Sequence, residues 1–187
     1  MTLNSVNQKA ASASGDIAGR DINKIYVRVK DEQVRALVMR LEAEVACDDQ
    51  KQQWIESLEF FDVPYAPDGV LGLKNKLDKS GRAERLDIAL RHKELFVKFL
   101  NKWALYGAAQ ELFALCLHRL YAEFESNVHP FCGNLTISEI DKIVSDKVIK
   151  VIVEDYGLGQ FALNHGLVLG MTYWLAERCY IRWHAQT

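Results

Sequence analysis

The sequence lacks the motifs that mark most catalytic and metal-binding proteins. No GxSxG, HExxH or P-loop pattern occurs in it. Its four cysteines are far apart and form no CxxC pair, so they indicate neither a disulfide framework nor a zinc ribbon. Reduced thiols in a cytosol are the simplest interpretation of this cysteine usage.

Long apolar runs and an excess of positive charge are also missing. Charged residues interrupt every apolar stretch well before the ~20 residues that span a bilayer. The first residues, MTLNSVNQKAASASGD, lack the apolar core of a signal peptide, so we expect a cytoplasmic protein with no membrane contact. The net charge of −2 argues against a dedicated nucleic-acid binder, because such proteins usually carry a basic surplus.

What the sequence does contain is typical of one helical domain. Hydrophobic residues make up 49% of the 187 residues, which is enough for a core. Apolar residues recur at helical spacing over 31–47, 83–103, 105–127, 136–156 and 160–180, with shorter pieces through Trp54–Phe61 and Leu71–Leu77. Thr136-Ile-Ser-Glu139 is a predicted capping box. We predict a mainly α fold, a multi-helix bundle over residues 30–187 with a short N-terminal β element.

The N-terminal region follows a different pattern. Residues 1–14 are small and polar, and we expect a flexible tail. The β-branched residues over 22–29 favour a short strand, which cannot bury a face by itself. We predict that residues 15–29 form an assembly element that pairs with another copy, and docking onto the chain's own helices is the alternative. Its repeated turn motif consists of Gly15, Asp16, Ile17, Gly19, Asp21 and Ile22.

Two sets of residues are candidates for a metal site or a catalytic pair. His129-x-x-Cys132 and Cys179-x4-His184 could supply four zinc ligands, but their spacing matches no known zinc finger. Cys116 and His118 are two residues apart on a predicted helix, so they do not face each other as a catalytic pair would. We therefore predict no catalytic residue, no metal and no cofactor.

The segment 74–102 is strongly basic, with nine lysine and arginine residues against four acidic ones. One interpretation is a surface that contacts phosphates, where affinity comes from counterion release. The alternatives are a solvated helix face and a surface that pairs with an acidic partner. The candidate phosphate contacts are Lys74, Lys76, Lys79, Arg82 and Arg85.

Three stretches of the sequence are similar to one protein family. They are Lys93-Glu94-Leu95-Phe96-Val97-Lys98 continuing to Ala109-Gln110, Phe124 with Val128-His129-Pro130-Phe131, and Gly170–Leu175 running to Cys179–Trp183. Together they resemble the helical C-terminal domains of the ABC-three-component conflict systems, over about residues 30–184. Lamassu-type anti-phage systems are similar in plan. The motif at 15–22 resembles short glycine–aspartate β elements that lie between effectors and such domains.

The resemblance implies a function in assembly. Those systems combine an SMC/Rad50-like ABC ATPase, a middle component and a protein whose C-terminal domain couples to an effector. It implies a non-catalytic coupling subunit that links ATPase to effector, that associates with itself, and that contacts nucleic acid only weakly or through the complex. A DNA-contacting accessory subunit using residues 74–102 is the alternative. Tyr180 stands where the family tends to have histidine, and only 14 residues precede the motif, where an effector domain is usual.

Large aromatic residues and arginine dominate binding hot spots, which suggests where a partner would dock. The alternative is that the same aromatic residues belong to the core, because the predicted helix 160–180 is apolar on all sides. The predicted partner interface consists of Trp103, Tyr173, Trp174, Arg182 and Trp183.

Overall fold

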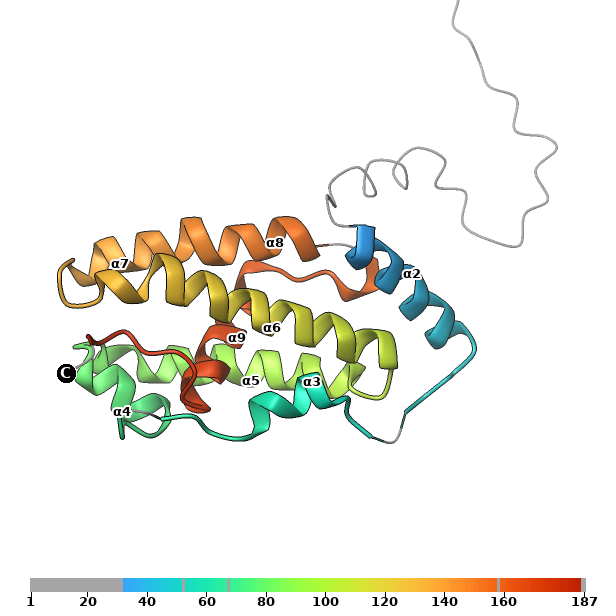
Figure 1. The fold of residues 1–187 in the computed structure, drawn as a ribbon, viewed down its shortest axis with the longest axis horizontal. Coiled ribbons are helices and arrows are strands. Elements are labelled where there is room, and N and C mark those ends of the chain that lie inside the picture. Colours follow the sequence, from blue (N-terminus) through green and yellow to red (C-terminus); the bar gives the residue numbers. More distant parts are fainter. Residues whose placement is uncertain (1–31, 52, 67, 158, 186–187) are drawn as a thin grey trace, which may run out of the picture.

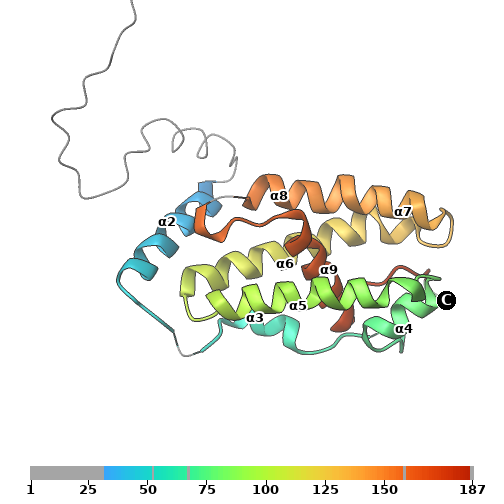
Figure 2. The same cartoon turned by 180° about the vertical axis from the view of Figure 1, so that it is seen from behind.

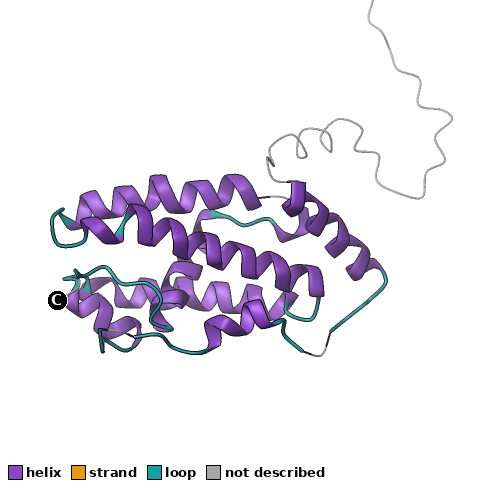
Figure 3. Ribbon diagram, in the orientation of Figure 1, coloured by secondary structure: helices purple, strands orange, loops and turns teal. Residues whose placement is uncertain are grey.

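The computed structural model describes residues 32–51, 53–66, 68–157 and 159–185. In these ranges the regular secondary structure is helical and contains no β-strand, so the predicted mainly α fold is confirmed (Figure 3). The predicted tail at 1–14 and β element at 15–29 lie outside the described residues. None of the helices in the part that is described is long and apolar enough to cross a membrane.

Three long helical segments run back and forth along the body (Figure 1). The first is α5 (Leu86–Trp103), which a short connection joins to α6 (Gly107–Asn127). The third consists of α7 (Ile137–Ile143), a π-helical segment (Val144–Ile149) and α8 (Lys150–Tyr156). The lengths of α5 and α6 match the prediction because both carry an apolar stripe over several turns.

Shorter helices complete this framework. The helix α2 (Glu32–Ala46) packs on α6, and α4 (Gly72–Lys79) packs on α9 (His165–Glu177). The α9 helix makes its most extensive contact with α5, beside which it lies in both views (Figures 1 and 2). The buried residues of α9 point in all directions, so this helix is the centre of the core.

The predicted capping box is present at the start of α7. The backbone N–H of Glu139 donates to Thr136 Oγ1 at 3.3 Å, and the backbone N–H of Thr136 donates to Glu139 Oε2 at 2.9 Å. These two bonds satisfy backbone donors that a helix start leaves without partners. The helix then continues to Tyr156, as predicted.

The short helix predicted through Trp54–Phe61 begins two residues later in the structure. It consists of α3 (Glu56–Glu59) and a 3-10 turn (Phe60–Asp62). The reason is a tertiary contact, because Gln110 is buried in α6 and its side chain accepts from the N–H of Ile55 at 2.9 Å. Residues just before α3 are therefore held by α6 rather than by a helical turn of their own.

The last predicted helix is also shorter, since α9 ends at Glu177 rather than near residue 180. Cys179 has φ +70°, and the N–H of Tyr180 donates to the carbonyl of Leu175 at 2.9 Å. This is a Schellman-type ending, in which glycine usually takes the left-handed position. The chain leaves α9 there, and residues 180–184, which we call the C-terminal strap, lie buried across the bundle.

Candidate functional site

The five residues predicted to form a partner interface lie inside the body. Each of them is at most 7% exposed. The ring of Trp174 contacts Phe96 at 5.6 Å between centroids, and Trp183 contacts Phe124 at 5.8 Å, both edge to face. The structure thus corrects the prediction in favour of its alternative, the core, and other residues must supply a surface for a partner. The five are Trp103, Tyr173, Trp174, Arg182 and Trp183.

Two polar contacts fix the C-terminal strap to the rest of the molecule. Arg182 Nε donates to His129 Nε2 at 2.9 Å, and His129 Nδ1 lies 3.5 Å from a carboxylate oxygen of Glu125. His184 Nε2 lies 2.7 Å from Asp68 Oδ2, and less than a tenth of either side chain is exposed. The strap is therefore held on one side by α6 and its following turn, and on the other by the loop before α4.

The pKa values of these groups show which protonation states the contacts need. Burial alone would raise the pKa of Asp68, but the N–H of Val70, His184 and nearby Lys76 outweigh it and lower this pKa to about 2. Burial lowers the pKa of His184, which Asp68 opposes only in part. Burial also lowers the pKa of His129, against the effect of Glu125. Both histidines are thus held neutral, and neutral His129 can accept from Arg182.

We expect the stability of the fold to decrease below pH ~6.5, the ordinary histidine pKa. Both folded-state pKa values are lowered, so the unfolded chain binds more protons in this range and acid favours it. A second loss should follow between the ordinary aspartate pKa of about 3.9 and the pKa of about 2 for Asp68, which favours folding only while ionised. Thermal melts from pH 7.5 to 5.5 test the first window.

The matched comparison for these melts is the double variant His129→Gln/His184→Gln, which keeps polar side chains but removes both titrating groups. Its melting temperature should change less between pH 7.5 and 5.5 than that of the parent chain. Equal slopes for the two chains would mean that neither histidine sets the acid sensitivity.

The candidate zinc ligands each have another partner. The thiol of Cys132 donates to the carbonyl of Val128 at 3.5 Å, and the thiol of Cys179 lies 3.7 Å from the carbonyl oxygen of Val70. Burial raises the pKa of Cys132 to about 11, so this thiol is not a nucleophile at neutral pH. Across the described ranges, no three His, Cys, Asp or Glu residues are grouped to hold a metal ion.

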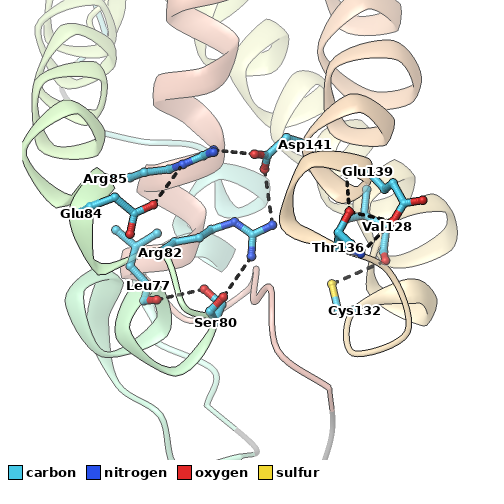
Figure 4. A network of polar contacts seen from close by, with 10 residues as sticks. All are labelled: Leu77, Ser80, Arg82, Glu84, Arg85, Val128, Cys132, Thr136, Glu139 and Asp141. Carbon is cyan, nitrogen blue, oxygen red and sulfur yellow. Dashed lines mark hydrogen bonds and ion pairs between the residues drawn. The ribbon is translucent and has the colours of Figure 1, made fainter.

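The predicted phosphate contacts do not form one surface. Lys76 is fully buried and Arg82 is 3% exposed, so the prediction is wrong for these two as contacts to duplex DNA. Arg82 donates to Asp141 at 3.3 Å, and Arg85 contacts the same carboxylate at 2.6 Å (Figure 4). Lys74 pairs with Asp78 one helical turn away. Of the five, Lys79 is exposed and lacks an ion pair among the described residues.

The outer face of α5 has both apolar and basic side chains exposed. Ile88 is 49% exposed and Leu95 is 46% exposed, although the other face of α5 is buried against α9. At helical spacing these residues share one side with three exposed cations. We call this set the α5 stripe: Ile88, Arg91, Leu95, Lys98 and Lys102 (α5 is seen in Figure 2).

The composition of the α5 stripe limits what it can contact. Lys98 also pairs with Glu94 at 2.8 Å, and the ammonium of Lys102 lies 4.6 Å from the ring centroid of Trp103. DNA phosphates would contact the cations of the stripe but would not use the exposed apolar side chains of Ile88 and Leu95. An acidic protein surface with apolar residues satisfies both kinds of side chain. Ile88 and Leu95 are seven residues apart, as are Arg91 and Lys98, and this spacing can be seen in the sequence. The interface prediction missed it because it used residue type alone.

Comparison with known proteins identifies the family of this domain. Residues 72–183 match the family described as C-terminal domain 9 of the ABC-three component (ABC-3C) systems. The matched part begins with α4, includes the α5 stripe and ends in the strap. No curated protein and no solved structure matches the chain. Because the match covers more than half of the sequence, the chain belongs to the family of C-terminal domain 9 of the ABC-three component systems.

Proposed function

We propose that this chain is a non-catalytic coupling subunit that links the SMC/Rad50-like ABC ATPase of its system to an effector. The observation that carries the proposal is the family match over residues 72–183, since membership of a system with several components implies partner proteins. The raised pKa of the Cys132 thiol, about 11, also argues against a cysteine nucleophile at this position. Self-association through residues 15–29 and a plan like that of Lamassu-type systems stay predictions.

The α5 stripe is the surface that we assign to the ATPase. Its two large apolar side chains, Ile88 and Leu95, are exposed on the same side of one helix as three cations, and these cations suit an acidic partner. Apolar residues at the centre of an interface with charges at the rim are the usual arrangement of a protein contact. The mechanism is positional: the chain holds the effector near the ATPase, and a conformational change in the ATPase is passed on through this contact.

The double variant Ile88→Asp/Leu95→Asp tests this assignment. Each substitution places a carboxylate where we expect an acidic, partly apolar surface, so binding loses apolar burial and gains repulsion. We expect the affinity for the ABC ATPase of the same system to decrease at least about tenfold, which corresponds to roughly 1.4 kcal/mol. Binding is measured by calorimetry with the full chain.

The matched control is Met39→Asp/Val63→Asp, because these residues are 57% and 69% exposed and lie outside α5. It should bind like the parent, and both double variants should melt near the parent temperature. Equal affinity of the stripe variant and the control would exclude the α5 stripe as the contact.

The alternative, a DNA-contacting accessory subunit, has weaker support. Burial of Lys76 and Arg82 leaves fewer cations on the predicted surface. The salt dependence of duplex binding separates the two functions, because each phosphate contact steepens the slope of log affinity against log salt by about one.

A further inference from the structure

A cavity of about 240 Å³ lies where the C-terminal strap passes between α4 and α7. One side consists of the end of α4 and the residues after it, including Lys79, Ser80 and Arg82, and the other includes Cys132 and the turn that follows it. Figure 4 shows the guanidinium of Arg82 between Asp141 and the carbonyl of Ser80, with Cys132 across from it. Trp183 and His184 of the strap complete the lining. None of these residues has a place in the proposed contact with the ATPase.

Two buried nitrogen atoms at this cavity have no hydrogen-bond partner among the described residues. They are Nε of Arg82 and Nδ1 of His184, in residues that are 3% and 6% exposed. The other bonds of Arg82 are long, at 3.3 Å to Asp141 and 3.4 Å to the carbonyl of Ser80. An unsatisfied buried polar group costs about 1–3 kcal/mol, and more when it is charged. A ligand that supplies partners for both atoms would remove this cost.

The charges around the cavity favour an anion. Lys79 and Arg82 line it, and the two carboxylates that contact lining residues are already paired, Asp141 with Arg82 and Arg85 and Asp68 with His184. The thiol of Cys132 adds no negative charge, because burial raises its pKa to about 11. The Nε2–H of neutral His184 donates to Asp68, which leaves Nδ1 as an acceptor. The site thus offers cationic donors and one acceptor.

We propose that this cavity binds a phosphate group, free or in a small monoester, with the phosphate between Lys79, Arg82 and His184. A phosphate supplies oxygen acceptors for Lys79 and for Arg82 Nε–H, and its singly protonated form has a hydroxyl that donates to His184 Nδ1. Leu135, Ile137 and Ile140 form an apolar wall beside this position. The volume is slightly below the ~300–1,000 Å³ of pockets for drug-sized ligands, so it suits a phosphate with a small organic part.

Two ligands could supply this phosphate group: free inorganic phosphate and a nucleoside monophosphate. Thermal melts of the full chain at constant ionic strength, with inorganic phosphate, adenosine monophosphate or adenosine, distinguish them. Millimolar phosphate or monophosphate should raise the melting temperature, and adenosine should not. A larger effect of the monophosphate assigns the site to nucleotides, and equal effects assign it to phosphate itself.

Lys79→Gln is the informative variant, because this residue lines the cavity and is exposed enough to leave the fold intact. Lys74→Gln is its control, an exposed lysine on the same helix that does not line the cavity. We expect Lys79→Gln to weaken ligand binding about fivefold or more in calorimetry, which is typical of losing one charge-assisted bond. No thermal shift with either phosphate ligand, or equal binding by the two variants, would overturn the proposal.

Discussion

Replacing Gly170 with alanine should destabilise the protein more than any other single-methyl addition to α9. A Cβ at this position would lie 2.2 Å from the carbonyl oxygen of His92 and 2.9 Å from Cβ of Phe96. The first atom belongs to the backbone of α5, so the clash cannot be relieved by a rotamer change. The two helices must separate, which we expect to cost about 3 kcal/mol, near the upper end for overpacked cores. Chemical denaturation measures this directly.

Gly166→Ala is the matched control, one turn earlier on the same helix. Its Cβ would lie 3.4 Å from Asn164 Oδ1 and 3.7 Å from His92, which are distances that neighbours tolerate. We expect a change within about 1 kcal/mol, with the helix propensity of alanine in its favour. Equal destabilisation by the two substitutions would contradict the close approach of α5 and α9 at Gly170.

Trp174→Ala should also have a large effect, with a loss of about 3–5 kcal/mol and of roughly 10 °C in melting temperature. Trp174 is 3% exposed, and its ring packs edge to face on Phe96 at 5.6 Å. The guanidinium of Arg178 lies 4.1 Å from the centroid of the Trp174 ring. Truncation leaves a cavity between α5 and α9 and removes this cation–π contact.

Trp174→Phe separates the loss of buried volume from the loss of the other contacts of Trp174, because phenylalanine retains much of the ring packing. It should lose less than half of the stability that Trp174→Ala loses. An unchanged melting temperature for Trp174→Ala would place this side chain at a surface and restore the interface role predicted from the sequence.

Much of the fold could be predicted because its helices are long and periodic. The apolar stripes of α2, α5 and α6 fix these elements within a few residues, and the capping box at Thr136 fixes the start of α7. The later start of the helix near Trp54 depends on Gln110, which is far away in the sequence. The end of α9 depends on Cys179 in a left-handed conformation that the sequence does not signal, since glycine is usual there.

The candidate sites were harder to predict, for a physical reason. Aromatic residues and arginine are typical of both binding hot spots and well-packed cores, so composition could not separate the two for Trp174 or Arg182. Similarly, the basic segment gave no sign that Lys76 and Arg82 are buried while Arg91 and Lys98 are exposed. That difference arises from how α4 packs on α9 and how α5 presents its outer face.

The most direct test of the coupling role is to mix the ABC ATPase and the effector of the same system with and without the purified full chain. Mass photometry then counts the assemblies that contain both proteins. We expect ATPase and effector to associate only when this chain is present, and the Ile88→Asp/Leu95→Asp variant to fail to join them. ATPase and effector that associate equally well in its absence would contradict the coupling role.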